Sequence, residues 1–444
     1  MKFSSQKISS VNTVITIILL TVISAASIID VLAVRILGLI GPDYSILVSV
    51  ITFVIIFGIF VIAWIIVLRA ISSFKTMYDY NSSKSFRLLY KVLVISPFLG
   101  SAIVIAIVFE MIKSENYHII LIPMATFASY IPAIMILSIL VLKLIVWFNR
   151  KHDYIMFSYT IALAAVLINA IFIIANMPAE MYDYLNVRES MTVQDRIAGI
   201  GVPNQYFMQA YQYSSFISFI LMWFATAILL RHYSKKVGKV IYWILVAVPL
   251  LYFLGQSPPI FNYIFSAVRD ADPLLYSRLS TLVFGLTKAA GGIFFAVGFW
   301  TIAESINNKQ IRNYLRLSGY GILLLFVATQ ANSVIISPYP PFGIIGFLSM
   351  ALASLLTFVG LYFTALSVSK ETELRIEIDK KITQLSFIKK MGIAQLENDL
   401  YRQILPIIEK TSKAEDSIPT SLENEDIKLF VKEALEAAKK TKTH

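Results

Sequence analysis

Residues 342–366 read FGIIGFLSMALASLLTFVGLYFTAL, a run of 25 residues without a charged side chain. A helix of about 20 apolar residues is long enough to cross the hydrocarbon core of a bilayer, so this run predicts a transmembrane helix. It continues into SVSKETELRIEI at residues 367–378, where charged residues return. We therefore expect the same helix to leave the membrane at that point.

Nine further apolar segments precede this run: residues 11–34, 44–68, 92–111, 119–142, 154–177, 214–230, 240–254, 282–302 and 317–336. The chain has 57% hydrophobic and 15% charged residues, with a mean hydropathy of +0.73. Residues 1–366 are therefore too apolar to form a soluble core. The sequence predicts an all-α fold, namely a polytopic transmembrane bundle of about ten spans at residues 1–366. The bundle is expected to lie in a lipid bilayer.

The distribution of lysine and arginine predicts the orientation of this bundle. Seventeen of these residues lie in or beside the loops on the side of both termini, and six lie on the opposite side. Because cytoplasmic loops carry the excess of positive charge, we expect both termini in the cytoplasm and the protein in the cell membrane. Lys2 and Lys7 before an apolar run that reaches Ala26 also fit a cleaved signal peptide. The run continues past Ala26, which favours an uncleaved first span.

Two of the predicted outer loops are long, residues 178–213 and 255–281. The five tyrosines of the first loop are typical of an interfacial aromatic belt with a short surface helix, and a ligand-binding lid is the alternative. The second loop contains Pro258 and Pro259, which cannot sustain backbone hydrogen bonds in lipid. We expect this loop to be shielded by other helices or to line a wet cavity.

The cytosolic tail is predicted to be helical and amphipathic over residues 367–410. Its first apolar stripe is a candidate interaction face, Leu374, Ile378, Ile382, Leu385 and Ile388, and a second stripe contains Ile393, Leu396, Leu400, Ile404 and Ile407. The first stripe favours either a short parallel coiled coil between two copies or a helix on the bundle or inner leaflet. A polar linker at residues 411–420 precedes a short terminal helix at residues 421–444, which needs a partner, a second copy or the preceding helix for stability.

Lys288 is the most anomalous residue of the predicted bundle, because it lies inside the apolar stretch LVFGLTKAAGGIFFAVGFW. A lysine at such depth costs about 2.5 kcal/mol or more on insertion scales, so a partner or a water path is expected. The candidate partners in an intramembrane polar site are Glu110, Asp30, Gln330, Asn332 and Asn262. The alternative is a purely structural pair between Lys288 and one carboxylate.

The sequence offers little support for chemistry. Cysteine is absent, and the four histidines lie at span ends or in the tail, so no metal site and no cofactor is expected. Recognisable catalytic motifs are also absent, which argues against an enzyme. The net charge of +11 lies in loops beside the membrane, while the tail is neutral with fourteen basic and fourteen acidic residues. We therefore expect no nucleic-acid partner.

The stretch GLYFTALSVSKETELRIEI at residues 360–378, with GIAQLENDLYRQIL at residues 392–405, resembles a family of uncharacterised archaeal polytopic membrane proteins. That family has the same junction between a last span and a cytosolic helical tail. The resemblance covers about the last quarter of the chain. It implies the architecture and no assigned activity.

Three functional hypotheses follow from these patterns. The first is a non-enzymatic receptor or sensor-like transducer, which signals through its C-terminal helix to a separate cytosolic protein partner. The second is a secondary transporter or channel with a polar site around Lys288. The third is a structural subunit of a membrane complex.

Overall fold

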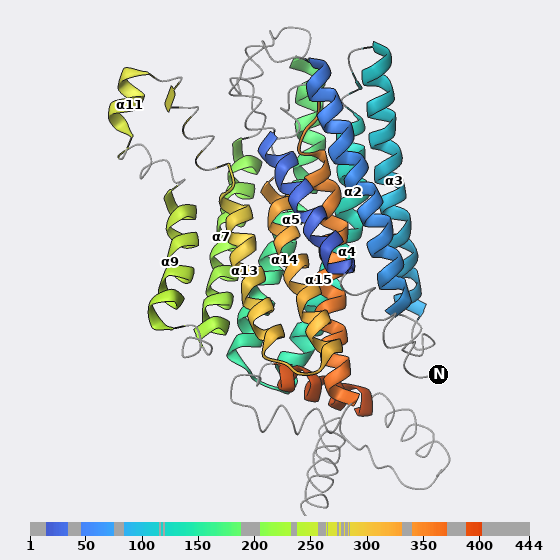
Figure 1. Cartoon of the computed structure of the whole chain (residues 1–444), viewed down its shortest axis with the longest axis vertical. Coiled ribbons are helices and arrows are strands. Elements are labelled where there is room, and N and C mark those ends of the chain that lie inside the picture. Colours follow the sequence, from blue (N-terminus) through green and yellow to red (C-terminus); the bar gives the residue numbers. More distant parts are fainter. Residues whose placement is uncertain are drawn as a thin grey trace, which may run out of the picture. The chain divides into compact units, whose positions relative to one another are not determined.

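The computed structural model describes most of the membrane-associated chain and part of the tail (Figure 1). The described residues are 15–33, 46–74, 84–114, 117–118, 120–187, 205–231, 238–255, 263, 265–272, 275–276, 279, 283, 285–330, 340–370 and 388–401. Every regular element in these ranges is a helix. The predicted all-α class is thus confirmed for the described part of the chain.

The helices follow one another with short breaks. We call the first the N-terminal helix and the last the tail helix. In chain order they are the N-terminal helix Ile15–Ala33, α2 (Ile46–Phe74), α3 (Lys84–Ser114), α4 (Leu121–Arg150), α5 (Tyr154–Val187), α7 (Gln205–Arg231), α9 (Lys239–Gly255), α11 (Ser266–Ala271), α13 (Thr287–Glu304), α14 (Lys309–Gln330) and α15 (Ile344–Lys370), followed by the tail helix at residues 388–401.

Six of these helices are long and apolar enough to cross a membrane: the N-terminal helix, α2, α4, α5, α7 and α15. Each of the ten apolar segments of the sequence overlaps one of these helices. The four helices outside the six are α3, α9, which is shorter at 17 residues, α13 and α14. The chain is therefore a helical membrane protein. The count of ten spans stays a prediction.

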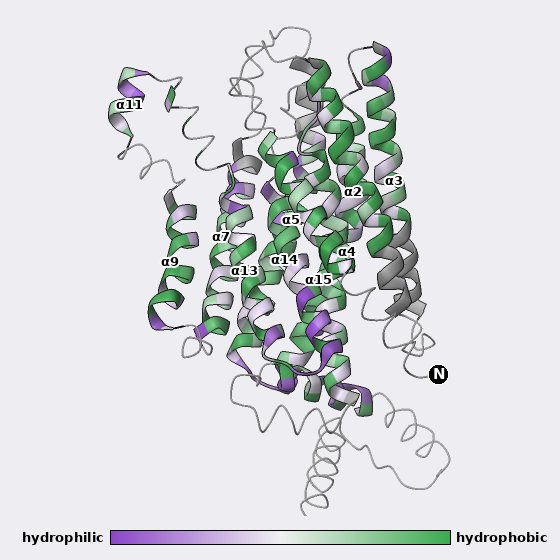
Figure 2. Ribbon diagram, viewed as in Figure 1, coloured by the Kyte–Doolittle hydropathy of each residue, from purple (hydrophilic) through white to green (hydrophobic). Residues whose placement is uncertain are grey.

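The outer face of α2 shows how the bundle meets its surroundings. Ile51, Ile55, Ile59 and Ile62 recur at steps of three or four and are 44–62% exposed. Figure 2 shows the same apolar character along α2 and α3. Exposed apolar stripes of this size are typical of lipid contact. In α15, by contrast, the whole of the most apolar stretch is buried within the protein.

The chain divides into two compact units. The first contains residues 1–141 and 158–361, and the second contains residues 142–157 and 362–444. In the first unit, α13 packs against α14, α9 and α7. The ring of Phe219 on α7 stacks on Phe253 of α9 at 3.6 Å and meets Phe295 of α13 at 5.3 Å and Phe326 of α14 at 6.0 Å, edge-on in both cases. These four rings form the apolar core of this part of the bundle.

Small residues bring α14 and α15 together as antiparallel neighbours within the first unit. A Cβ on Gly321 would lie 2.5 Å from the backbone nitrogen of Thr357, and one on Gly360 would lie 2.5 Å from the carbonyl oxygen of Tyr314. Only glycine permits this backbone approach. The end of α14 and the beginning of α15 consequently lie at the same end of the helix pair.

The second unit joins the turn between α4 and α5 to the end of α15 and the tail helix. Trp147 of α4 stacks on Tyr362 of α15, and Gly392 of the tail helix lies where a Cβ would be 2.3 Å from Val368 of α15. The tail helix therefore packs directly on α15. Four residues of the predicted interaction face, Leu374, Ile378, Ile382 and Leu385, lie outside the described residues, and Ile388 begins the tail helix with 1% exposure.

Candidate functional site

The C-terminal end of α14 is the centre of the candidate site. The last carbonyl groups of a helix have no partner within it. Lys288 of α13, which is half-buried, donates hydrogen bonds to the carbonyl oxygen of Thr329 at 2.8 Å and to the hydroxyl of Tyr211 at 3.1 Å. Tyr211 of α7 donates to the same carbonyl at 2.9 Å. A cation at this position also opposes the negative end of the helix dipole.

Lys288 also lies 5.3 Å from the centre of the Tyr211 ring. The direct bond to the hydroxyl places the ammonium at the edge of that ring, so the polar contact with the hydroxyl is the main interaction. A true cation–π contact would place the ammonium over the ring face. Tyr211 thus acts here through its oxygen.

Gln330 reciprocally caps α13. Its side-chain oxygen accepts a hydrogen bond from the backbone nitrogen of Ala289 at 2.9 Å, and its amide nitrogen donates to the carbonyl oxygen of Gly285. The first turn of α13 receives no capping bond from the side chain of Leu286, the residue just before it. The end of α14 and the start of α13 therefore satisfy each other's backbone groups.

Helices α4 and α5 complete this cluster. Tyr130 of α4, which is fully buried, donates to the carbonyl oxygen of Ala328 at 3.4 Å. Asn169 of α5 donates to Ser214 of α7 at 2.9 Å and to the carbonyl oxygen of Tyr211 at 3.4 Å. We call Lys288, Tyr211, Tyr130, Thr329 and Gln330 the α14-end cluster. Together with Asn169, it joins five helices by polar contacts.

Asp30 caps the N-terminus of α15, as Lys288 caps the C-terminus of α14. It is fully buried in the N-terminal helix, and its Oδ2 accepts hydrogen bonds from the backbone nitrogens of Ile345 at 3.0 Å and Gly346 at 3.1 Å. The chain enters α15 through Gly343, whose φ of 94° suits glycine. A carboxylate at a helix N-terminus is stabilised by the free N–H groups and the dipole. We call Asp30 and the two N–H groups the Asp30 cap.

Two buried oxygens at this cap have no hydrogen-bond partner within the described structure. They are Oδ1 of Asp30 and the hydroxyl of Ser27, one turn away on the same face of the N-terminal helix. A buried polar atom without a partner costs about 1–3 kcal/mol. A hydrogen-bond donor bound at the Asp30 cap would therefore satisfy an oxygen that the described structure leaves without a partner.

Ser129 of α4 links the two parts of the site. Its hydroxyl donates to the carbonyl oxygens of Phe347 at 2.9 Å and Leu348 at 3.2 Å, and it accepts from the backbone nitrogen of Ala351 at 3.2 Å. The next residue, Tyr130, contacts the end of α14. One turn of α4 therefore touches the end of α14 and the start of α15.

The structure distributes the sequence-predicted site residues as follows. Lys288 and Gln330 meet at the α14-end cluster, whereas Asp30 bonds to α15. Glu110, near the end of α3, accepts a hydrogen bond from the backbone nitrogen of His118 at 2.7 Å. Asn332 and Asn262 lie outside the described residues.

The sequence did not single out Tyr211 or Tyr130. The sequence predicts Tyr211 in the outer loop 178–213, but residues 178–187 belong to α5 and residues 205–213 to α7. Tyr211 is 6% exposed. A tyrosine within an apolar helix gives no signal of its partner when that partner is a backbone carbonyl.

The second unit has its own polar contacts around the turn between α4 and α5. Oδ1 of Asp153 accepts from the backbone nitrogens of Ile155 and Met156 and caps α5, while Oδ2 pairs with Lys390 of the tail helix. Lys151 pairs with Glu397 at 2.6 Å. Ion pairs on both sides of the turn thus hold the tail helix.

The buried face of the tail helix contains both polar and apolar residues. Trp147 donates to the side-chain oxygen of Gln395 at 2.9 Å, and Gln395 donates in turn to Asp399 at 2.8 Å. Ile388, Met391, Ala394, Gln395 and Asn398 are buried, whereas Ile393, Leu396 and Leu400 are only half-buried. The described residues of the second apolar stripe are therefore less buried than these five.

Comparison of the chain with protein-family models, with curated proteins and with solved structures finds no match. The resemblance of residues 360–378 and 392–405 to an archaeal membrane family therefore stays a prediction. No group of three or more histidine, aspartate or glutamate side chains suited to a metal ion occurs within the described ranges.

Proposed function

We propose that this chain is a ten-span membrane protein with both termini in the cytoplasm, and that it acts as a sensor-like transducer. A stimulus at the outer face or within the bilayer would change the packing of α15. The tail would pass this change to a separate cytosolic protein. The positive-inside charge pattern supports the orientation.

One observation supports this proposal above the others, namely that α15 belongs to both units. Residues 344–361 lie in the first unit, where Asp30 caps the start of the helix, and residues 362–370 lie in the second. Packed helices transmit small shifts between discrete arrangements because a close-packed interior deforms little. A change at the Asp30 cap would therefore reach the tail helix through a single element.

The two unpartnered oxygens at the Asp30 cap favour this site as the point where a stimulus acts. A ligand with a hydrogen-bond donor, or a proton on Oδ1, would give these oxygens a partner and alter the charge at the start of α15. The free energy available is that of satisfying a buried polar group, about 1–3 kcal/mol. That range shifts a two-state equilibrium by about 5-fold to 150-fold.

A second candidate function, a secondary transporter, is favoured by the α14-end cluster. Helix ends and a half-buried lysine within a bundle are features of substrate sites in transporters. Here Lys288 lies at the end of α14, with Tyr211 and Tyr130 around it. The α14-end cluster would then be the substrate site.

The experiment that tests the transducer proposal is photo-crosslinking in the native membrane. A photo-reactive residue at Leu396, which is half-buried on the tail helix, is compared with one at Ile59, which is 44% exposed on the apolar face of α2. We expect one cytosolic protein to be captured from position 396 and none from position 59. Capture of the same membrane subunits from both positions would contradict the proposal and favour a structural subunit.

Truncation separates the transducer from the transporter. A chain without residues 392–444 should lose its output if the tail signals, whereas a transporter should keep substrate flux. Replacement of Lys288 by methionine separates the transporter from the structural subunit. A transporter would lose more flux than its loss of stability explains, whereas a structural subunit would lose stability alone.

A further inference from the structure

Two exposed cations lie at the neighbouring ends of α7 and α9, both in the first unit. Arg231 is the last residue of α7, and Lys239 is the first residue of α9. The hydroxyl of Tyr242, in the first turn of α9, donates a hydrogen bond to the carbonyl oxygen of Ala227, one turn before Arg231, at 3.1 Å. The two helices therefore bring both cations to the same end of the pair. We call Arg231 and Lys239 the α7–α9 cations.

The α7–α9 cations have no acidic partner in the described structure. Residues 231–239 read RHYSKKVGK, with four basic residues, and no aspartate or glutamate occurs between Asp195 and Asp270. A distant segment can supply a carboxylate in a folded chain, but within the described ranges neither Arg231 nor Lys239 makes an ion pair or a side-chain hydrogen bond. This positive charge is therefore open to an external anion.

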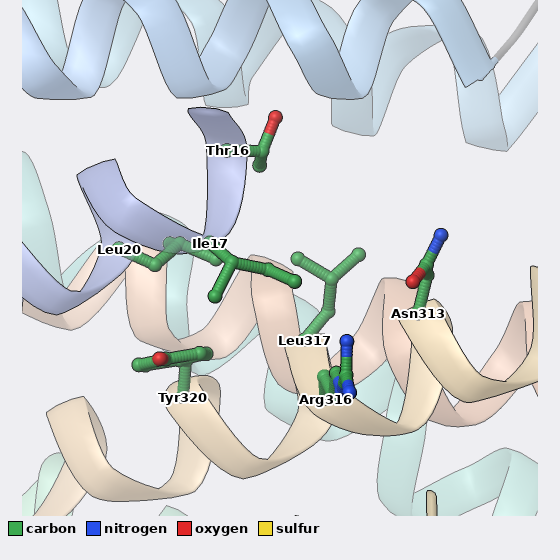
Figure 3. Close-up of a pocket in the computed structure, with 7 residues that line it drawn as sticks. All are labelled: Thr16, Ile17, Leu20, Asn313, Arg316, Leu317 and Tyr320. Atoms are coloured by element: carbon green, nitrogen blue, oxygen red, sulfur yellow. The ribbon is translucent and has the colours of Figure 1, made fainter. Parts of the chain in front are cut away.

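Two basic residues at other predicted cytoplasmic ends of helices differ in this respect, because the protein itself supplies their anions. Lys151, at the turn between α4 and α5, pairs with Glu397 of the tail helix. Arg316 of α14 lies beside a narrow hollow that faces the N-terminal helix (Figure 3), and it pairs with Glu304 of α13. An external anion would have to compete with a carboxylate at either position, but not at the α7–α9 cations.

An exposed apolar stripe on α9 begins directly after Lys239. Its members recur at steps of three or four and are 55–72% exposed, and we call them the α9 stripe: Val240, Ile244, Val248 and Leu251. Trp243, one turn after Lys239, is 60% exposed, and tryptophan at the end of an apolar helix is typical of the headgroup level of a bilayer. Figure 2 shows the hydrophilic end of α9 next to its apolar length. Lipids whose acyl chains cover the α9 stripe therefore place their headgroups beside the α7–α9 cations.

We propose that the α7–α9 cations and the α9 stripe form a binding surface for anionic phospholipids. The anionic headgroup lies at Arg231 and Lys239, and an acyl chain of the same lipid lies along the stripe. Basic clusters at the cytoplasmic boundary of a membrane attract anionic lipids, and the positive-inside pattern places this end of α7 at that boundary. An acidic cytosolic protein fits less well, because the stripe beside the cations is apolar. The surface involves neither α15 nor the tail, so it goes beyond the proposed function.

Fluorescence quenching by brominated lipids tests this surface on the full-length chain. The chain contains no cysteine, so a fluorophore on Ile241→Cys, a position that is 53% exposed, reports on the lipids beside the cations. The labelled chain is reconstituted in phosphatidylcholine vesicles with a minor fraction of brominated phosphatidylglycerol or of brominated phosphatidylcholine. We expect phosphatidylglycerol to bind at this position about fivefold more strongly or better, since each cation near an anionic membrane surface contributes roughly that factor.

Matched variants make the test specific. The double variant Arg231→Gln, Lys239→Gln should lose most of the preference for phosphatidylglycerol, whereas Lys239→Arg keeps the charge and should keep the preference. Arg269→Gln is the control for charge alone, because it removes an exposed arginine of α11 that pairs with Asp270, and it should bind as the unaltered chain does. A fluorophore on Leu142→Cys, which is 62% exposed on α4, is the control for position and should report a weaker preference.

Three results would overturn the proposal, each judged on chains with unaltered helical content. The first is equal binding of the two lipids at position 241, which would favour an acidic protein as the partner of the cations. The second is an unchanged preference in the double variant. The third is an equal loss of preference in Arg269→Gln, which would indicate unspecific attraction to the net charge of the chain.

Discussion

Replacing Lys288 with methionine should destabilise the bundle even though it removes a charge from an apolar helix. The ammonium donates to the carbonyl oxygen of Thr329 and to Tyr211, and hydrogen bonds to charged groups contribute about 1.5–3 kcal/mol each. The position at a helix C-terminus adds about 0.3–1 kcal/mol. Against this, the variant avoids an insertion cost of about 2.5–3.5 kcal/mol. The middle of these ranges gives an expected net loss of about 2 kcal/mol.

A double-mutant cycle shows whether this loss arises from the contact itself. Tyr211→Phe removes the acceptor of the Lys288 bond and a donor to Thr329. We expect the two substitutions to be non-additive by about 1 kcal/mol or more. The assay is reversible unfolding in mixed micelles, followed by helical circular dichroism. Ser138→Ala, which removes a bond within α4 itself, serves as the control partner and should be additive with Lys288→Met.

Additivity of Lys288→Met and Tyr211→Phe to within about 0.3 kcal/mol would refute this reasoning. So would a variant at Lys288 that is as stable as the unaltered chain. Either result would mean that the ammonium is solvated from elsewhere, and the α14-end cluster would lose its central contact.

Two further predictions concern the tail helix and the exposed ion pair between Arg316 and Glu304. Gly392→Ala should loosen the packing of the tail helix, because the new Cβ would lie 2.3 Å from Val368 and overpacking costs about 1–3 kcal/mol. Limited proteolysis should therefore cut the tail of this variant sooner. The control is Gly58→Ala, where the new Cβ meets nothing within 4 Å, and it should be neutral or stabilising. Equal proteolysis of both variants would contradict the packing of Gly392 against Val368. The hydrogen bond from Arg316 lowers the pKa of Glu304 below its usual 4.5. The ionised carboxylate therefore stabilises the fold above about pH 4.5, and this contribution is lost as pH falls through the folded-state pKa. The effect should be about 0.5 kcal/mol at most: thermal unfolding of Glu304→Gln should lack this small acid dependence, and identical pH profiles would show that the ion pair contributes nothing.

The helices were predictable from the sequence because the thickness of the membrane sets the length of an apolar segment. The residues at which the helices end were harder to predict. The apolar segment 119–142 predicts where a span ends, but α4 continues to Arg150, because Lys143 interrupts the apolar run while Leu144 and Trp147 beyond it are still buried. Hydropathy therefore reports membrane thickness and not helix length.

The candidate site was predictable only where a charge interrupts an apolar run. Lys288 and Asp30 were identified on that ground, but their described hydrogen-bond partners include backbone groups at helix ends. Backbone atoms have no signature in composition, so the sequence suggested carboxylates and amides instead. Gln330 was predicted as a partner of Lys288, and its described bonds are to the backbone of Ala289 and Gly285.

The tail shows the same limit. In the second apolar stripe, Ile393, Leu396 and Leu400 are only half-buried. Gly392 instead lies against Val368, and Gln395 accepts a hydrogen bond from Trp147. Close approach requires a small residue and a matched hydrogen bond, and neither contributes to an apolar periodicity.

The absence of cysteine from the chain allows one direct measurement of the central claim, that α15 couples the Asp30 cap to the tail. Spin labels at Tyr154→Cys and Lys389→Cys report the distance between the start of α5 and the tail helix within the second unit. Asp30→Asn, which removes the charge at the start of α15, should shift this distance by about 2 Å or more, the scale of helix movements in switching proteins. Ser24→Ala removes a hydroxyl whose described hydrogen bond is to Leu20 of its own helix, and should leave this distance unchanged. An identical distance distribution in Asp30→Asn and the unaltered chain, with both fully helical, would contradict the account.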